Sequence, residues 1–292
     1  MKDPRHVNLA SYDAIVVSTS AGKDSTALLA YMYLRCAELG IADRIVVVHA
    51  DLGRMEWPGT EDLARRQARR YGLRFEVVRQ TYDLLDNVLD KRQRDLARGK
   101  DQPSWPGMGQ MQRWCTSQLK TTPISKLITR LKVELQQQGH AGPARVLDCI
   151  GVRAGESASR AKAMSKHGVL RPVKSNGQVH VDKYYPIAWW TDADVWRLIR
   201  AERLPVHRAY QLGMPRLSCV FCIYASKEAL ALAAYHNLAL LDQYCDAEEA
   251  TGYSFTQDIS LTQLRDEIEL REWDHITTAQ HIAWGDHKQE GK

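Results

Sequence analysis

Long apolar runs and densely spaced cysteines are both missing from this chain of 292 residues. No run approaches the roughly 18 apolar residues that a membrane-spanning helix requires, so we expect no membrane partner. The opening residues, MKDPRHVNLASYD, lack the apolar stretch of a secretory signal. Six cysteines in a chain of this length do not make a dense disulfide scaffold. We therefore expect a cytoplasmic protein whose thiols are reduced.

Two common phosphate-binding loops are absent as well. The GxGxxG pattern of dinucleotide-binding proteins does not occur, and GxxxxGK[ST] fails because Asp24 follows Lys23. The chain also shows no internal repeat and no low-complexity tract. These absences argue against a dinucleotide-dependent reductase and against a kinase.

Charge is unevenly distributed, although the net charge is only +5. Residues 62–100 contain 11 Lys and Arg against 6 Asp and Glu, and residues 101–174 contain 12 against 4. Residues 240–292 reverse the balance, with 4 against 12. A basic middle indicates an anionic partner, either nucleic acid or nucleotide, although a solvated surface with an arbitrary bias is the alternative.

Apolar runs alternate with helical patterns along the first half of the chain. The runs predict strands at Ala14–Ser18, Arg44–Ala50, Arg74–Arg79 and Arg145–Gly151. The helical patterns lie at Ser25–Leu39, Glu61–Tyr71, Asp83–Arg98 and Thr116–Gln138. Such alternation predicts an α/β fold with a doubly wound, mainly parallel sheet and helices on both faces. Continuous runs such as RIVVVHA fit strands that are covered on both sides.

Turn and cap residues predict the structure of the rest of the chain. Residues 99–113 predict a long loop, and residues 152–183 look irregular, with a hairpin near Asn176–Gly177. Thr191 should begin a helix, with Asp194 completing a capping box. The chain after Ser226 reads as helical, with an acidic end. We expect a main domain over residues 1–228 and a helical C-terminal extension over residues 229–292.

The stretch VVSTSAGKDSTALLAYM, residues 16–32, joins the first predicted strand to the first predicted helix. Small residues let backbone N–H groups converge on an anion, and a helix N-terminus adds partial positive charge. Lys23 adds a full charge, whereas Asp24 suits a metal ion or the helix N-terminus. The junction therefore predicts a phosphate site, with a plain capped turn as the alternative.

The segment STSAGKDST, residues 18–26, resembles the PP-loop, SGGxDS, of ATP pyrophosphatases, which cleave ATP between its α and β phosphates. Ala21 stands at the motif's first glycine, which narrows the backbone freedom there. The resemblance implies that Lys23 and Asp24 are catalytic. It also implies that ATP with Mg²⁺ is bound by Ser18, Ser20, Gly22, Lys23, Asp24 and Ser25.

Four further stretches resemble the phosphoadenosine phosphosulfate (PAPS) reductase superfamily. They are RWCTSQLKTTPISKLI (113–128), GVRAGESASRA (151–161), YYPIAWWTDADVWRLI (184–199) and SCVFCIYAS (218–226). With the PP-loop they follow the family's order over about residues 14–226, which implies an adenine nucleotide alpha-hydrolase-like fold.

Charged residues in and beside these motifs are candidates to hold anions or a metal. Within the matched motifs, Lys120, Arg153 and Arg160 are expected to hold phosphate or sulfate and to act in catalysis. Asp51, at the end of the second strand, lies where ligands bind in open α/β sheets. Glu156 could bind the cofactor's metal or orient an arginine, and a structural ion pair is the alternative.

Three cysteines form a second group of candidates, namely Cys115, Cys219 and Cys222. Three thiolates fit an iron–sulfur cluster with one open iron, a zinc site that wants a fourth ligand, or redox and persulfide thiols. The apolar flank of the C-x-x-C pair suits a shielded cluster. We therefore expect an iron–sulfur cluster at these three residues and consider zinc the weaker alternative.

The pattern of departures from the family suggests the reaction. Assimilatory sulfonucleotide reductases usually end in a Glu-Cys-Gly-(Leu/Ile)-His segment with a nucleophilic cysteine, which this chain lacks. The RWCT form with a later C-x-x-C resembles the sulfurtransferase branch that serves DNA phosphorothioation. That resemblance implies an ATP pyrophosphatase-type sulfurtransferase with DNA as acceptor and a cysteine desulfurase as sulfur donor.

Three other functions stay open. A PAPS or adenylyl-sulfate reductase would act on a small sulfonucleotide but lacks its nucleophile here. A tRNA thiolation enzyme would need an RNA-binding appendage, and none is recognisable in the sequence. A nucleotide-sensing subunit with a vestigial site is the alternative outside enzymes, and the intact Lys23, Asp24 and Ser25 argue against it.

Overall fold

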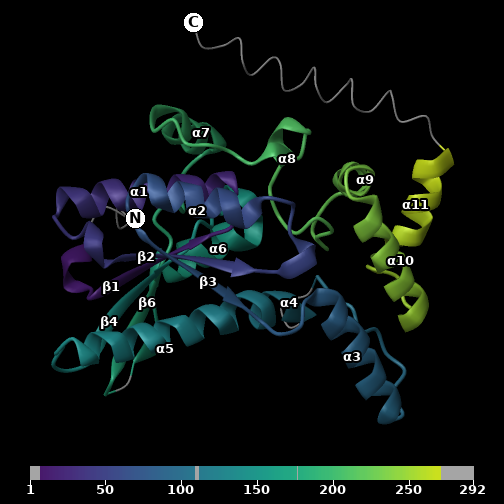
Figure 1. Cartoon of the computed structure of the whole chain (residues 1–292), viewed down its shortest axis with the longest axis horizontal. Helices are drawn as coiled ribbons and strands as arrows, with labels where there is room; N and C mark the ends of the chain where they lie inside the picture. Colours follow the sequence, from purple (N-terminus) through teal and green to yellow (C-terminus); the bar gives the residue numbers. More distant parts are fainter. Residues whose placement is uncertain (1–6, 109–111, 176, 271–292) are drawn as a thin grey trace, which may run out of the picture. The chain divides into compact units, whose positions relative to one another are not determined.

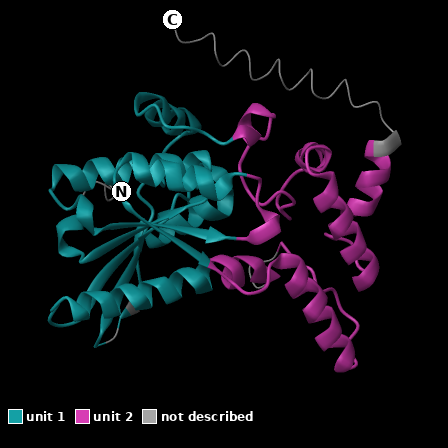
Figure 2. Cartoon of the chain, viewed as in Figure 1, with its two compact units in different colours: residues 1–51, 59–78, 121–207 teal, residues 52–58, 79–120, 208–292 magenta. Residues whose placement is uncertain are grey.

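The computed structural model describes residues 7–108, 112–175 and 177–270 (Figure 1). Contacts divide the chain into two compact units, each built from separate segments (Figure 2). Unit 1 comprises residues 1–51, 59–78 and 121–207, and unit 2 comprises residues 52–58, 79–120 and 208–292. This division differs from the expected one at residue 228, because two earlier segments share a unit with the C-terminal helices.

Unit 1 is built on a six-stranded sheet, as the alternating pattern predicts. The strands are β1 Ala14–Thr19, β2 Ile45–Asp51, β3 Arg74–Arg79, β4 Ala144–Cys149, β5 Leu170–Ser175 and β6 Val179–Tyr184. Their order is β3-β2-β1-β4-β6-β5. β1 pairs in parallel with β2 and β4, and β4 with β6, whereas β5 and β6 are antiparallel. The α/β fold with a mainly parallel sheet is thereby confirmed.

Helices cover both faces of this sheet because its central strands are apolar on both sides. Helices α1 (Lys23–Glu38) and α2 (Thr60–Arg70) lie on one face, and α5 (Thr122–Gln137) lies on the other (Figure 1). Ile15 belongs to the same buried cluster as Leu28 of α1, whereas Val16 belongs to that of Leu127 in α5. Alternate residues of β1 thus serve two separate cores.

Two expectations about unit 1 are corrected in detail. Residues 152–183 are not irregular, since they contain the short η7 turn (Ala154–Glu156), α6 (Ala158–His167) and the β5–β6 hairpin. Helix α6 buries only Met164, so it has no apolar stripe from which to predict it. The hairpin and the Thr191–Asp194 capping box of α7 (Asp192–Ala201) are confirmed, with Asn176 outside the described residues.

Unit 2 is helical in the residues that the structure describes. Its helices are α3 Leu84–Ala97, α4 Trp114–Thr116, α8 Arg208–Gln211, α9 Lys227–Tyr235, α10 Leu238–Thr251 and α11 Leu261–Leu270. The expected helix Thr116–Gln138 begins instead at Trp114 and passes through a π-helical turn, Ser117–Thr121, before α5. Residues 271–292 of the acidic tail lie outside the described residues. Across the described part of the chain, no helix combines the length and the apolar character needed to cross a bilayer.

A buried carboxylate organises the C-terminal helices of unit 2. Glu248 of α10 is 7% exposed and accepts hydrogen bonds from the N–H groups of Phe255, Leu261 and Thr262. The hydroxyls of Ser260 and Thr262 donate to it as well. Burial raises the pKa of Glu248, but these donors outweigh burial and hold the pKa below its usual value. Glu248 therefore joins α10 to the start of α11 as an ionised group.

Candidate active site

The predicted phosphate loop connects β1 to α1 at the carboxyl edge of the sheet. Strand β1 ends at Thr19 and α1 begins at Lys23, so only three residues make the turn. Gly22 is the N-cap residue and has no side chain with which to cap the helix. The helix N-terminus thus faces the loop without a side-chain cap, which suits an anion.

Ala21 adopts the left-handed backbone conformation, with φ of 54°. Glycine reaches this region freely, whereas an L-residue with a Cβ is strained there by about 1–2 kcal/mol. The Thr19 hydroxyl accepts a hydrogen bond from the Ala21 N–H at 3.1 Å and supports the turn. Ala21, which replaces the motif's first glycine, therefore keeps the loop's backbone path but holds a strained backbone conformation.

Serine and threonine hydroxyls tie the loop to the first turn of α1. Ser25 Oγ donates to the Gly22 carbonyl at 2.9 Å and accepts from the Ser20 N–H at 3.2 Å. Thr26 Oγ1 also donates to the Gly22 carbonyl, at 3.0 Å. Ser18 Oγ is buried with no hydrogen-bond partner among the described residues. A bound polar group would satisfy such a hydroxyl, which supports the prediction of a ligand at this loop.

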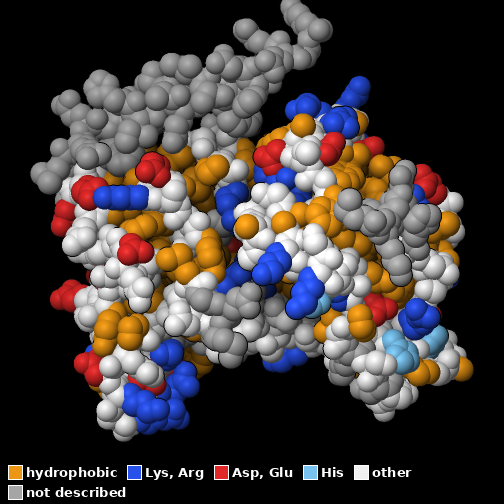
Figure 3. Space-filling view, turned by 180° about the vertical axis from the view of Figure 1, so that it is seen from behind, with side chains coloured by type: hydrophobic (Ala, Val, Ile, Leu, Met, Phe, Trp, Pro, Cys, Tyr) orange, Lys and Arg blue, Asp and Glu red, His pale blue; other side chains and the backbone are white. Residues whose placement is uncertain are grey.

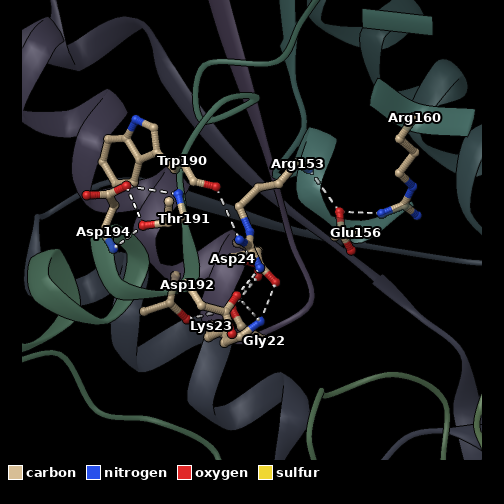
Figure 4. Close-up of polar contacts among 12 residues, drawn as sticks. Gly22, Lys23, Asp24, Arg153, Glu156, Arg160, Trp190, Thr191, Asp192 and Asp194 are labelled. Carbon is tan, nitrogen blue, oxygen red and sulfur yellow. Dashed lines mark hydrogen bonds and ion pairs between the residues drawn. The ribbon is translucent and has the colours of Figure 1, made fainter. Parts of the chain in front are cut away.

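Two buried cations and two carboxylates form a charge network beside the loop (Figure 4). Lys23 Nζ lies 3.2 Å from Asp24 Oδ2 and 3.4 Å from Asp192 Oδ1. Arg153 Nε donates to Asp24 Oδ1 at 2.6 Å, and its Nη2 contacts Asp192 Oδ1. The remaining Arg153 Nη1 donates to the Trp190 carbonyl at 3.2 Å. The structure thus brings Lys23, Asp24 and Arg153 together, as the motifs predict.

Burial and charge act against each other on this network. Lys23 and Arg153 are each 6% exposed, which would be costly for unpaired cations. Burial lowers the pKa of Arg153, but Asp24 and Asp192 outweigh it and raise that pKa above its usual value. Burial likewise raises the pKa of Asp192, and Lys23 and Arg153 outweigh it. The pKa shifts of Arg153 and Asp192 therefore both favour the ionised forms of this pair.

Glu156 links the network to Arg160. Its Oε2 accepts from the Arg153 N–H at 2.9 Å and pairs with the Arg160 guanidinium (Figure 4). Arg160 reaches the network through Glu156, so it is a less direct anion ligand than Arg153. Of the two roles expected for Glu156, these contacts favour the orientation of an arginine.

Gly151 allows the loop after β4 to approach the start of α1. A Cβ on Gly151 would lie 3.0 Å from the Asp24 carbonyl oxygen and 3.2 Å from the Ser25 nitrogen. Asp51 ends β2, which neighbours β1 in parallel, so it lies at the same carboxyl edge as the loop. This edge is where ligands bind in open α/β sheets.

The three predicted cysteines and Lys120 all belong to unit 2. Burial raises the pKa of Cys219 to about 11, Lys120 lowers it, and Cys222 and Cys115 raise it. Burial also raises the pKa of Cys115, again with Lys120 opposing it and Cys222 adding to it. The thiols are thus close enough to change one another's pKa values, and the charge of Lys120 favours the thiolate forms of Cys115 and Cys219.

These thiols lie near one another but are not arranged as a metal site. Within the described residues, no group of three or more Cys, His, Asp or Glu side chains is arranged to hold a metal ion. All six cysteines are free thiols, with Cys36, Cys149 and Cys245 buried. The donor chemistry suits a cluster but its arrangement does not, so the iron–sulfur site stays a prediction.

Asp192 is the residue of this site that sequence reasoning missed. The capping box directs attention to Thr191 and Asp194, which bond each other and cap α7. Asp192 is simply the first helical residue, and its contacts with Lys23 and Arg153 span 169 and 39 positions of sequence. An extra carboxylate beside the cap residue is the one local signal that could have drawn attention to it.

The fold and this loop define a nucleotide-binding α/β domain, and a family match specifies it further. The sequence matches the model of the phosphoadenosine phosphosulfate reductase domain over residues 14–225. The chain belongs to this family, as the four matched stretches predict. A comparison with curated proteins finds no match.

Several solved structures are similar to this chain at low sequence identity. Phosphoadenylyl-sulfate (PAPS) reductase from Candida auris is 16% identical, with 74% of this chain and 88% of that chain covered and a TM-score of 0.43. The U34-tRNA thiolase NcsA from Methanococcus maripaludis, solved with its [4Fe-4S] cluster, is 15% identical, with 90% and 75% covered and a TM-score of 0.42. Candida glabrata FMN adenylyltransferase is 13% identical, with 75% and 60% covered and a TM-score of 0.42. Family membership rests on the sequence match.

Proposed function

We propose that this chain is an ATP-dependent sulfurtransferase that activates its acceptor as an adenylate. The observation that carries the proposal is the pair of buried cations, Lys23 and Arg153, held by Asp24 at a PP-loop. A helix N-terminus, hydroxyls and two cations can stabilise the negative charge that develops on a departing pyrophosphate. Family membership supports an adenine nucleotide as the ligand.

The residues of the loop would act chiefly by holding phosphates. Lys23 and Arg153 would turn from carboxylates to phosphate oxygens and stabilise the charge that develops on pyrophosphate. Asp24 is a hard oxygen donor of the kind that Mg²⁺ prefers, and Mg²⁺ bound there would neutralise phosphate charge. Ser18 Oγ, buried without a partner among the described residues, would donate to the same ligand.

The proposed reaction balances in two stages. An acceptor oxygen attacks the α-phosphorus of ATP, and the bond to the β-phosphate breaks to release pyrophosphate. The terminal sulfur of a persulfide on one unit 2 cysteine then attacks the activated atom, and AMP leaves with the acceptor oxygen. A second thiol breaks the sulfur–sulfur bond, which leaves a thiolated acceptor and an enzyme disulfide. An external dithiol reduces that disulfide.

The sulfur donor and the acceptor are proposed from chemistry and charge. A cysteine desulfurase would supply the persulfide sulfur. A nucleic acid acceptor suits unit 1, whose segments contain 24 Lys and Arg against 16 Asp and Glu. Helix α6 has no acidic residue and exposes Lys162 and Lys166, and Lys and Arg side chains gather in several groups on the face drawn in Figure 3. DNA and tRNA are the two acceptors to compare.

Reduction of a sulfonucleotide is the second candidate, and the family match favours it. In that reaction a thiolate would attack the sulfur of PAPS or adenylyl sulfate and release the nucleotide. No cysteine follows Cys245, so the C-terminal nucleophile of such reductases is absent from the sequence. Cys115, Cys219 or Cys222 would have to replace it.

Pyrophosphate release from ATP with Mg²⁺ tests the proposal directly. We expect turnover that needs a nucleic acid acceptor and that falls about two orders of magnitude in Asp24→Asn. Asp43→Asn is the matched control, because Asp43 is exposed in the turn before β2, at the opposite edge of the sheet. Sulfite release from PAPS without pyrophosphate release from ATP would instead establish the second candidate.

A further inference from the structure

Asp192 occupies an unusual place between the two buried cations. One oxygen, Oδ1, contacts both Lys23 Nζ, at 3.4 Å, and Arg153 Nη2 (Figure 4). Asp24 differs, because its two oxygens are divided between the same two cations, with Oδ1 on Arg153 and Oδ2 on Lys23. A single anionic oxygen held by a lysine and an arginine is also how proteins hold a phosphate oxygen.

The two carboxylates differ in how easily they could leave. The Asp24 side chain is 20% exposed and lies in the first turn of α1, whereas the Asp192 side chain is 61% exposed. The α7 cap is made by Thr191 and Asp194 and does not use the Asp192 side chain. Asp192 can therefore rotate into solvent without breaking a helix cap, while the cations beneath it stay buried.

We infer that Asp192 is a built-in competitor, whose carboxylate occupies the position of a phosphate oxygen until the nucleotide displaces it. The inference rests on the proposed function, which assigns the loop to phosphate binding. In the empty site, Asp192 compensates the charge of Lys23 and Arg153 where water has little access. In the loaded site its negative charge stays near the phosphates and weakens their binding, which speeds product release.

The competitor role predicts that loss of this charge tightens phosphate binding. Inorganic pyrophosphate and α,β-methylene ATP are suitable probes, because neither requires turnover. We expect Asp192→Asn to lower the Kd of both by roughly twofold to fivefold in titration calorimetry at low salt, which corresponds to the upper part of the range for one exposed charge. The effect should shrink as salt is raised. Asp192→Glu keeps the charge and should keep Kd near the wild-type value.

Asp43→Asn again serves as the control, since it removes the same charge at the opposite edge of the sheet and should leave Kd unchanged. Circular dichroism melts confirm folding, and Asp192→Ser is a second variant if Asn destabilises α7. An unchanged Kd in Asp192→Asn would overturn the inference, and a higher Kd would make Asp192 a ligand rather than a competitor. If the wild-type protein binds neither probe, both the phosphate assignment and this inference fail. If it binds them but releases no pyrophosphate from ATP, only the proposed reaction fails.

Discussion

A methyl group added to Gly151 should disturb the candidate site through the backbone at the start of α1. Its Cβ would meet the Asp24 carbonyl oxygen at 3.0 Å, the Asp24 carbonyl carbon at 3.1 Å and the Ser25 nitrogen at 3.2 Å. All three are backbone atoms, so no side-chain rotation relieves the contact. The start of α1 or the loop after β4 must shift by a few tenths of an ångström.

The size of the effect follows from that shift. It acts on Asp24, which orients both Lys23 and Arg153. Because a misplacement of about 1 Å can cost about 100-fold in rate, a few tenths should lower kcat/KM about five- to tenfold. The overpacking should also lower the free energy of unfolding by about 1–2 kcal/mol.

Gly155→Ala is the matched control for this experiment. A Cβ on Gly155 meets no atom within 4 Å, although Gly155 lies between Arg153 and Glu156 in the same loop. Pyrophosphate release is measured for both variants after thermal melts show that each is folded. If Gly151→Ala is folded and its kcat/KM stays within about twofold of Gly155→Ala, the argument from close approach is refuted.

Three more predictions concern unit 2 and the surface of unit 1. Glu248→Gln should lower the free energy of unfolding by about 2–3 kcal/mol in denaturant titrations, against under about 0.5 for its exposed neighbour in Glu249→Gln. The pKa of folded Glu248 lies below its usual 4.5, so the stability that the ionised carboxylate contributes is fully present above pH 4.5 and is lost as the pH falls through the folded pKa. The free energy of unfolding of Glu248→Gln should lack this pH dependence. If the free energy of unfolding changes with pH equally in the wild type and in Glu248→Gln, the capping role is contradicted. Iron and acid-labile sulfide analysis after anaerobic purification should decide between the two roles of the unit 2 cysteines: an absorption band near roughly 400 nm that Cys222→Ala removes would establish the predicted cluster, whereas a colourless, metal-free protein would support the persulfide route of the proposed reaction. The double variant Lys162→Glu, Lys166→Glu should weaken nucleic-acid binding and make the slope of log K against log salt concentration shallower by about one to two. Unchanged binding would mean that the acceptor binds elsewhere.

Local sequence determined most of unit 1. Unbroken Val and Ile runs are typical of strands buried on both sides, and the apolar runs predict β1 to β4 to within two residues, although β3 lies at the edge of the sheet. The phosphate loop was equally predictable, because small residues, hydroxyls and Lys23 at a strand–helix junction are neighbours in sequence. Helix α6 was not, because it buries only Met164 and carries no periodic apolar signal.

Tertiary structure decided which of the predicted residues work together. Lys23, Arg153 and Asp192 come from three elements that meet only because β1 and β4 pair and α7 packs on α1. Pairing and packing of this kind depend on contacts between residues far apart in the chain, which no local pattern records. Lys120 is a second example of a contact that local sequence does not record. Its motif predicts an anion ligand, and in the structure its charge also acts on the thiols of Cys115 and Cys219 in unit 2. The sequence by itself determined the loop and the family, and the fold decided the charges that surround the loop.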